Sequence, residues 1–178
     1  MRRAAGVLAA VVVAAAGVVA LIAFFSGRDS APVSSTLSGP GQVFADQGAG
    51  RLAPGARPPV PYNSNPPTSG AHAPTPVTRD AADLSNNQLL TALAAGNVVL
   101  FYAAAHPPPA LRALAEAEAG PFDPPLAATG QAVILARRAN TPGVVAAAWR
   151  HLLRTPSPSD PALKQFVEAW LGVGRDGK

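Results

Sequence analysis

The feature that most constrains this chain is a long uncharged stretch near its beginning. Residues 4–25, AAGVLAAVVVAAAGVVALIAFF, form 22 consecutive positions without a charge. At about 1.5 Å per residue, a helix of this length spans about 33 Å, enough to cross a hydrocarbon core of about 30 Å. We therefore predict a transmembrane helix within residues 1–25, which confines any globular domain to the rest of the chain.

The charges around this stretch predict its orientation. Arg2 and Arg3 precede it, whereas Arg28 and Asp29 cancel each other after it. Positive residues favour the cytoplasmic side, so we expect a cytoplasmic N-terminus and an extracytoplasmic remainder. A cleaved secretory signal is the competing interpretation, but its apolar region is normally about 7–15 residues long and is followed by a small-residue cleavage site. No clean site follows Phe25, which favours an uncleaved, single-pass anchor in the cell membrane.

Residues 26–61 are predicted to form a flexible tether. They contain six Gly, six Pro and five Ser with few bulky apolar side chains, so they cannot bury enough surface to offset the entropy of ordering. A flexible chain of this length has a mean span of roughly 30–35 Å. Val43 and Phe44 are the residues in this segment that could dock on a following domain.

Cysteine usage and charge exclude several classes of function. The chain has no cysteine, so a disulfide framework, a thiolate metal site and a cysteine nucleophile are ruled out. Its net charge of +4 arises in the termini and the tether, because residues 60–172 hold seven basic and seven acidic side chains. Nucleic-acid binding needs clustered Lys and Arg with stacking aromatic residues, and that pattern is missing.

Residues 62–172 are predicted to form one small α/β domain, followed by a tail at 173–178. The expected elements are a helix over 85–95, a buried strand over 98–103, a helix over 111–120, a buried strand over 131–138, a helix over 143–153 and an amphipathic helix over 161–171. Ser85, Thr141-Pro142 and Asp160-Pro161 supply the N-terminal signals of three of these helices. The βαβ order implies a right-handed parallel crossover, followed by C-terminal helices, with a thioredoxin-like arrangement as one outcome. Two strands make a thin sheet, so a further strand is expected near Val60–Tyr62 or elsewhere.

The stretch YNSNPPTSGAHAP at 62–74 is the main candidate for a functional site. Pro66-Pro67 holds the chain extended and Gly70 is free to adopt a positive φ, which predicts a rigid loop. One interpretation is a structural loop that closes over the domain. The other is the wall of a ligand site that presents His72, together with further polar groups. Those polar candidates are Tyr62, Asn63, Thr68, Ser69 and His106.

The remaining polar candidates carry weaker signals. His106 follows a predicted strand, a common functional position in α/β folds, although an exposed turn histidine is the simpler interpretation. A Ser69–His72–Asp80 triad can be drawn, but loop residues this close in sequence rarely achieve its geometry. His151 is expected on a helix, three residues from Arg154, as a surface or boundary residue. Arg137-Arg138 is interpreted as a solvated pair, with an anion contact as the alternative.

The loop also resembles a known family signature. VPYNSNPPTSGAHAP at 60–74 is similar to the motif Y-N-x-x-P-P-T-S-G-x-H of the bacterial family called domain of unknown function 3105, whose members are often membrane-anchored and extracytoplasmic. The resemblance covers roughly residues 42–171. Within it, VVAAAWRHLL at 144–153 is similar to the family's Ala-Trp helix and FVEAW at 166–170 to its closing helix.

The departures from this family matter as much as the matches. The family's H-x-L-E-H-G aligns with TALAAGNVVLFY at 91–102, so Thr91, Ala94 and Ala95 stand where the resemblance places His, Glu and His. Another family histidine often lies near Arg51 and Leu52. Such a set would suit a metal or proton-transfer site, and of it this chain keeps His72 alone. The resemblance therefore implies a divergent member that has lost the site.

These observations predict a membrane-anchored, extracytoplasmic binding or scaffolding module of the cell envelope. It is expected to be non-catalytic, with no cofactor and no bound metal, and to contact the membrane through residues 4–25. Its partner would be an envelope protein or a small ligand. The alternative is a metal-binding protein or a metal-dependent enzyme that uses His72 and His106.

Overall fold

The computed structural model describes residues 39–177. The predicted membrane helix over 4–25 and the first part of the predicted tether lie outside these residues. Within the described residues, no helix is long and apolar enough to cross a membrane.

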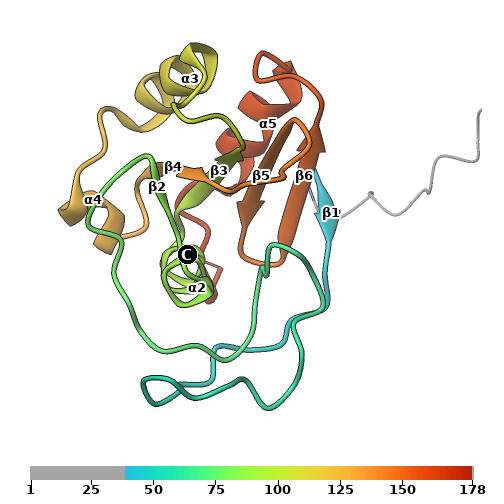
Figure 1. Cartoon of the computed structure of the whole chain (residues 1–178), viewed down its shortest axis with the longest axis vertical. Coiled ribbons are helices and arrows are strands. Elements are labelled where there is room, and N and C mark those ends of the chain that lie inside the picture. The colour runs from blue at the N-terminus through green and yellow to red at the C-terminus, as the bar shows by residue number, and fades with distance from the viewer. Residues whose placement is uncertain (1–38, 178) are drawn as a thin grey trace, which may run out of the picture. The chain divides into compact units, whose positions relative to one another are not determined.

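The described residues form a mixed α/β domain with a six-stranded sheet and four helices (Figure 1). The strands are β1 (Gln42–Val43), β2 (Ala82–Asp83), β3 (Val98–Tyr102), β4 (Val133–Arg137), β5 (Val144–Ala148) and β6 (His151–Thr155). The helices are α2 (Asn86–Ala95), α3 (Pro109–Ala119), α4 (Pro124–Ala128) and α5 (Pro161–Trp170). The strand order is β1-β6-β5-β3-β4-β2.

The centre of the sheet confirms the predicted parallel βαβ unit. Strands β3 and β4 are parallel, in register from Val98 opposite Val133 to Tyr102 opposite Arg137. Helices α3 and α4 lie between them in the chain. Strand β2 adds to β4 in parallel, whereas β5, β6 and β1 follow on the other side of β3 as an antiparallel series.

The sheet is covered on both faces. Val99 and Phe101 of β3 belong to the apolar cluster that contains Leu90 of α2, whereas their neighbours in β3 belong to the cluster that contains Leu111 of α3 and Phe166 of α5. Figure 1 shows α2 on one side of the sheet and α3 and α5 on the other. Because successive strand residues point to opposite faces, a strand covered twice is apolar at every position, as β3 is.

Helix α2 begins and ends where the sequence predicts. Ser85 accepts a hydrogen bond from Gln88 N, and the Gln88 side chain accepts one from Ser85 N, which completes a capping box. At the other end Gly96 adopts φ 117°, a left-handed conformation that favours glycine. The leucines between these ends, Leu89, Leu90 and Leu93, are at most 1% exposed, and burial of each stabilises the fold by about 1.5–3 kcal/mol.

The segment at 143–153 is not the predicted helix. Residues 144–148 and 151–155 form the β5–β6 hairpin, whose turn is Trp149-Arg150. Arg150 has φ 65°, and its N–H donates to Thr68 O at 2.9 Å while its carbonyl accepts from Phe44 N at 2.8 Å. Contacts from distant segments therefore fix the turn, and they override the helix propensity of an alanine-rich run. The helix that the resemblance to the family's Ala-Trp segment implied is likewise wrong for this chain.

The other predicted elements are confirmed with shifted ends. Helix α3 starts at Pro109 and α5 at Pro161, where Asp160 accepts a hydrogen bond from Ala162 N at 2.9 Å. No strand forms at Val60–Tyr62; the short strands β1 and β2 complete the sheet instead.

Residues 39–61, the second part of the predicted tether, lie on the domain. Strand β1 pairs with β6, with Gln42 opposite Leu152. Pro40 O accepts a hydrogen bond from Trp170 Nε1 at 2.9 Å, and Phe44 packs against the apolar cluster on the α2 side. The sheet therefore begins before the predicted domain boundary at residue 62.

Candidate functional site

The loop at 62–74 is folded against residues 45–52 by backbone and hydroxyl hydrogen bonds. Gly70 N donates to Gly48 O at 2.7 Å, and His72 N donates to Gly50 O at 2.9 Å. Ser69 Oγ accepts from Gln47 N at 3.0 Å. These bonds hold the loop as a fixed structure, as the proline and glycine positions predict.

The polar candidates of this loop are used within the fold. Thr68 and Ser69 are fully buried. Thr68 Oγ1 lies 3.1 Å from Ser64 Oγ, while the Tyr62 hydroxyl donates to Ala71 O at 2.9 Å. Asn63 Nδ2 donates to Ala45 O at 2.8 Å. Each of these side chains supports the loop's conformation, which favours the structural interpretation of the motif.

His72 is held in one tautomer. Its side chain is buried, and Nδ1 lies 2.9 Å from Gly70 O. Because a carbonyl oxygen only accepts hydrogen bonds, Nδ1 carries the proton and neutral His72 has its lone pair on Nε2. A single Nε2 could act as one ligand or one base, so the function of His72 depends on which groups surround it.

The structure does not assemble the expected companions of His72. His106 is exposed in the turn after β3 and makes no hydrogen bond or ion pair with any described residue. Asp80 is occupied elsewhere, so the Ser69–His72–Asp80 triad is not formed. Among residues 39–177, no group of three or more His, Asp or Glu side chains is placed to hold a metal ion.

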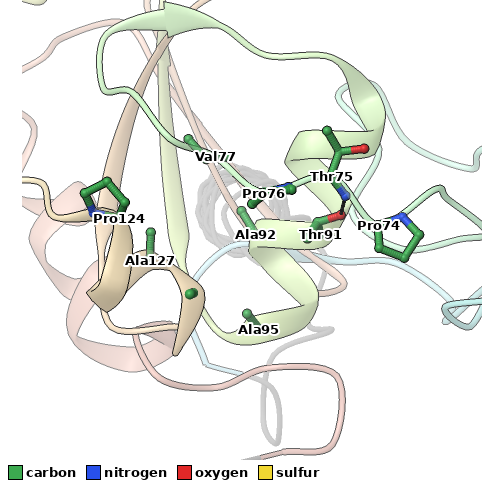
Figure 2. Close-up of a pocket in the computed structure, with 10 residues that line it drawn as sticks. Pro74, Thr75, Pro76, Val77, Thr91, Ala92, Ala95, Pro124 and Ala127 are labelled. Carbon is green, nitrogen blue, oxygen red and sulfur yellow. Dashed lines mark hydrogen bonds between the residues drawn. The ribbon is translucent and has the colours of Figure 1, made fainter.

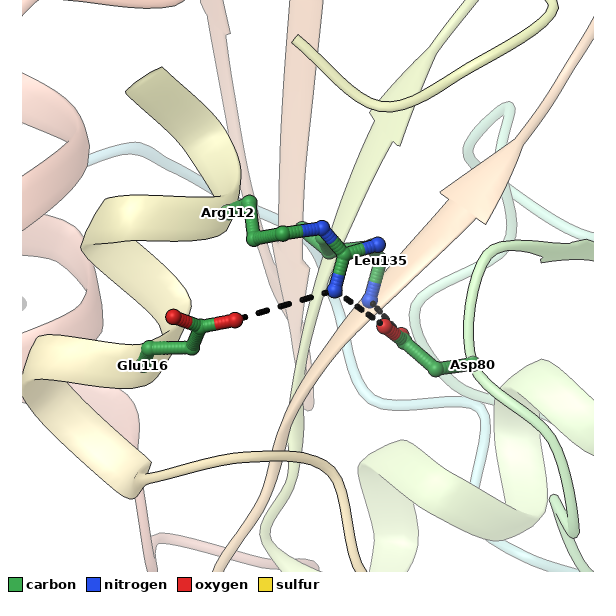
Figure 3. Close-up of polar contacts among 4 residues, drawn as sticks. All are labelled: Asp80, Arg112, Glu116 and Leu135. Carbon is green, nitrogen blue, oxygen red and sulfur yellow. Dashed lines mark hydrogen bonds and ion pairs between the residues drawn. The ribbon is translucent and has the colours of Figure 1, made fainter. Parts of the chain in front are cut away.

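Asp80 instead joins the sheet to α3 (Figure 3). Its Oδ1 accepts a hydrogen bond from Leu135 N at 2.9 Å, and its Oδ2 lies 3.5 Å from Arg112 Nη1. The Arg112 guanidinium is also 3.8 Å from Glu116. The nearby Tyr102 hydroxyl is buried without a hydrogen-bond partner among the described residues. Burial, and then the charge of Asp80, raise the pKa of Tyr102, so the phenol stays neutral at physiological pH.

His151 is a core residue, which corrects the predicted helix surface. It lies in β6, buried, with its ring stacked on Trp170 at a centroid distance of 3.6 Å. Its Nδ1 has no hydrogen-bond partner among residues 39–177. Burial, and then the charge of Arg150, lower the pKa of His151 from 6.5 to about 4. The ring is therefore neutral at pH 7 and serves packing.

An apolar pocket of the described domain lies between α2, α4 and the segment at 74–77 (Figure 2). Its volume is about 230 Å³. The lining is apolar except for two threonines and consists of Pro74, Thr75, Pro76, Val77, Thr91, Ala92, Ala95, Pro124, Ala127 and Ala128. His72 is not part of this lining. A pocket of this composition can accept an apolar group, and it contains no acid, base or metal ligand.

One hydroxyl gives the pocket a polar contact. Thr91 Oγ1 accepts a hydrogen bond from Thr75 N at 2.9 Å, shown as a dashed line in Figure 2. The Thr91 hydroxyl proton has no acceptor among residues 39–177, so it is available to a ligand oxygen.

Two of the three helix positions singled out by the family resemblance line this pocket. Thr91 and Ala95 are one helical turn apart on the same face of α2. Ala94 faces elsewhere: it packs against the α2-side cluster, and its carbonyl accepts from Arg175 N at 3.0 Å. The sequence therefore indicated the helix but not the pocket. The other two walls of the pocket are residues 74–77 and α4. In the sequence, both are proline-rich segments that indicate only loops.

The end of α2 is closed by two glycine-containing segments. A Cβ on Gly130, which has φ 78°, would stand 2.0 Å from Ala95 O, and a Cβ on Gly174 would stand 2.5 Å from Ala94 O. Only glycine permits so close an approach of backbones. These contacts of Gly130 and Gly174, here called the glycine junction, fix the C-terminal end of α2, whose Ala95 lines the pocket.

Comparison with known proteins gives one match. Residues 56–175 match the family described as "Protein of unknown function (DUF3105)". No curated protein and no solved structure matches the chain.

Proposed function

Since the chain belongs to the DUF3105 family of proteins of unknown function, we propose that its domain is a non-catalytic binding module whose ligand site is the pocket between α2 and α4. The single observation that carries this proposal is the chemistry of the lining. Eight of the ten side chains around the pocket are Pro, Ala or Val, and none is titratable. Such a site can bind a group, but it has no residue that could transfer a proton or hold a metal.

The volume suggests the size of the bound group. An apolar cavity of about 150 Å³ is large enough for benzene, so about 230 Å³ accommodates one aromatic ring or one branched aliphatic chain. It is too small for a whole nucleotide or flavin, since cofactor pockets are commonly about 300–1,000 Å³. We therefore propose an apolar anchor of an envelope protein or of a small ligand, oriented by a hydrogen bond from Thr91.

The membrane anchor belongs to the same proposal. Residues 4–25 would cross the membrane with the N-terminus in the cytoplasm and hold the domain on the outer side. The support is the uncharged run and the arginines before it. Because residues 39–61 lie on the domain, the free tether would shrink to 26–38, with a mean span of about 20 Å. Deletion of residues 4–25 is expected to release the chain from membranes under alkaline carbonate extraction; retention would contradict the anchor.

The connectivity suggests a fold type for the core. The elements follow in the order β3-α3-α4-β4-β5-β6-α5. We propose that their strand order β6-β5-β3-β4, with β5 antiparallel to β3, is thioredoxin-like. With no cysteine in the chain, this core cannot perform thiol–disulfide exchange. The proposed fold type therefore agrees with a binding function.

The pocket can be tested with labelled alanines. Four alanine methyls line it: Ala92, Ala95, Ala127 and Ala128. We expect indole, titrated into full-length protein in an uncharged maltoside detergent, to shift these methyl NMR signals. Ala95→Leu should fill the pocket and weaken binding at least tenfold, while Ala117→Leu on the exposed side of α3 serves as the matched control. Absence of shifts at these methyls, or equal effects of both variants, would refute the site.

The natural partner can be sought with the same pair of variants. A photo-crosslinking amino acid at Pro74, on the exposed rim of the pocket, should capture a partner in intact membranes. The crosslink is expected to disappear with Ala95→Leu and to persist with Ala117→Leu. Capture that is equal in both variants would point to a different surface.

A further inference from the structure

A second cavity lies on another side of the loop at 62–74, where the chain leaves β4. Its volume is about 330 Å³, and its polar lining consists of Asn65, Arg138, Asn140, Thr141 and Arg154. The floor is Val145 of β5, which is only 1% exposed. The cavity shares no lining residue with the apolar pocket between α2 and α4.

Two arginines converge in this cavity on one residue. Arg138 Nη2 donates to Asn65 Oδ1 at 2.6 Å, and Arg154 Nη2 donates to the backbone oxygen of Asn65. The Arg138 guanidinium also lies 5.8 Å from the centre of the Phe101 ring, within cation–π range. Each guanidinium group is thus oriented by a hydrogen bond to Asn65.

The positive charge in the cavity is not neutralised by the domain. Among the described residues, neither Arg138 nor Arg154 has a carboxylate within 4.0 Å, whereas Arg112, Arg137 and Lys164 do. No Asp or Glu lines the cavity. Each guanidinium has five N–H donors, and each uses only one of them on Asn65, so most donors remain available.

We infer that this cavity binds a small ligand through an oxyanion, a phosphoryl or carboxylate group, held between Arg138 and Arg154. Guanidinium groups bind both kinds of oxyanion through paired N–H donors. The Asn140 amide makes no hydrogen bond with another described residue and can add a contact. Pro66 and Pro142 provide an apolar wall for the rest of the ligand. On this inference, the role of the rigid loop at 62–74 is to orient Arg138 and Arg154 through Asn65. It is not to present His72 to a ligand.

The test uses full-length protein in a maltoside detergent, which contains no phosphate. Inorganic phosphate, sulfate and acetate are titrated at constant ionic strength against chloride, and the arginine Nε–H signals are followed by NMR. We expect saturable shifts at Arg138 and Arg154. Binding of phosphate and sulfate over acetate would identify a phosphoryl ligand, and the reverse order would identify a carboxylate ligand.

Two variants and one control separate the site from general charge effects. Arg154→Gln should weaken binding by about 10- to 100-fold, the effect of a lost charged hydrogen bond. Asn140→Asp places a carboxylate in the cavity without altering the contacts to Asn65, and it should weaken binding at least tenfold even if Arg154→Gln fails to fold. Arg57→Gln removes an exposed charge outside the cavity and should change binding less than twofold. Absence of saturable binding, or equal losses in Asn140→Asp and Arg57→Gln, would overturn the inference.

Discussion

Mild acid is expected to destabilise this protein through His151. The residue is 8% exposed, its ring is stacked on Trp170, and its Nδ1 has no partner among residues 39–177. Protonation in the folded state would place a charge among apolar groups and beside Arg150. Burial first, and the Arg150 charge second, therefore lower the pKa of His151 from 6.5 to about 4.

The sign and size follow from proton linkage. At a pH between the unfolded value of 6.5 and the folded value of about 4, the unfolded chain binds more protons than the folded chain, so the free energy of unfolding falls as the pH falls. The loss from this one group is about 2 kcal/mol at pH 5, and it approaches a limit of about 3 kcal/mol below pH 4. Above about pH 7.5, one unit above the unfolded pKa, the contribution no longer changes.

Chemical denaturation can isolate this effect. The chain has two tryptophans, and Trp170 touches His151, so fluorescence reports both unfolding and the state of the imidazole. The free energy of unfolding of the full-length protein is measured by guanidinium titration near pH 7.5 and near pH 5. Between these pH values it should fall by about 2 kcal/mol less in His151→Phe than in the wild type. His106→Gln, which alters an exposed histidine, should behave like the wild type.

Two results would refute this reasoning. One is an equal loss of unfolding free energy in the wild type and in His151→Phe between these pH values. The other is a transition near pH 6.5 in the tryptophan fluorescence of the folded protein that His151→Phe abolishes, because that transition would show the folded histidine to titrate normally.

Three further predictions concern the scaffold and the metal content. Ser85→Ala removes the oxygen that accepts from Gln88 N at 3.2 Å, so denaturation should show a loss of about 1 kcal/mol; no loss would contradict a role for the cap. Gly130→Ala should cost more than about 3 kcal/mol because of its clash with Ala95 O, whereas Gly55→Ala, with a similar φ of 79° and open space around it, should cost only about 1 kcal/mol; equal costs would refute the clash. Elemental analysis should find no stoichiometric zinc or copper, and tight binding of either would favour the metal-dependent alternative.

Most of the fold was predictable because its signals are local. The cap at Ser85, the helix start at Pro161, and the apolar runs of β3 and β4 each depend on neighbouring residues in the chain. The β5–β6 hairpin was not predictable in this way. Both β3 and β5 are buried at all five positions, but three of the five residues of β5 are alanine, which favours a helix, whereas β3 consists of β-branched, leucine and aromatic residues.

The candidate site was predictable only in part. The loop at 62–74 is rigid as expected, but its hydroxyls and its histidine are used inside the fold. The two cavities depend on segments that are far apart in the chain, such as Asn65 with Arg154 and Thr75 with Thr91. Sequence spacing contains no information on such pairs until the topology of the sheet is known.

The glycine junction at the end of α2 has an evolutionary consequence. Gly130 and Gly174 touch the backbone of that helix so closely that no other residue fits, and we expect selection to hold both positions invariant within the family. Thr91 and Ala95 face the pocket and carry no comparable restraint. A lineage can therefore exchange the chemistry of this pocket through substitutions on one helical turn while the scaffold is inherited unchanged.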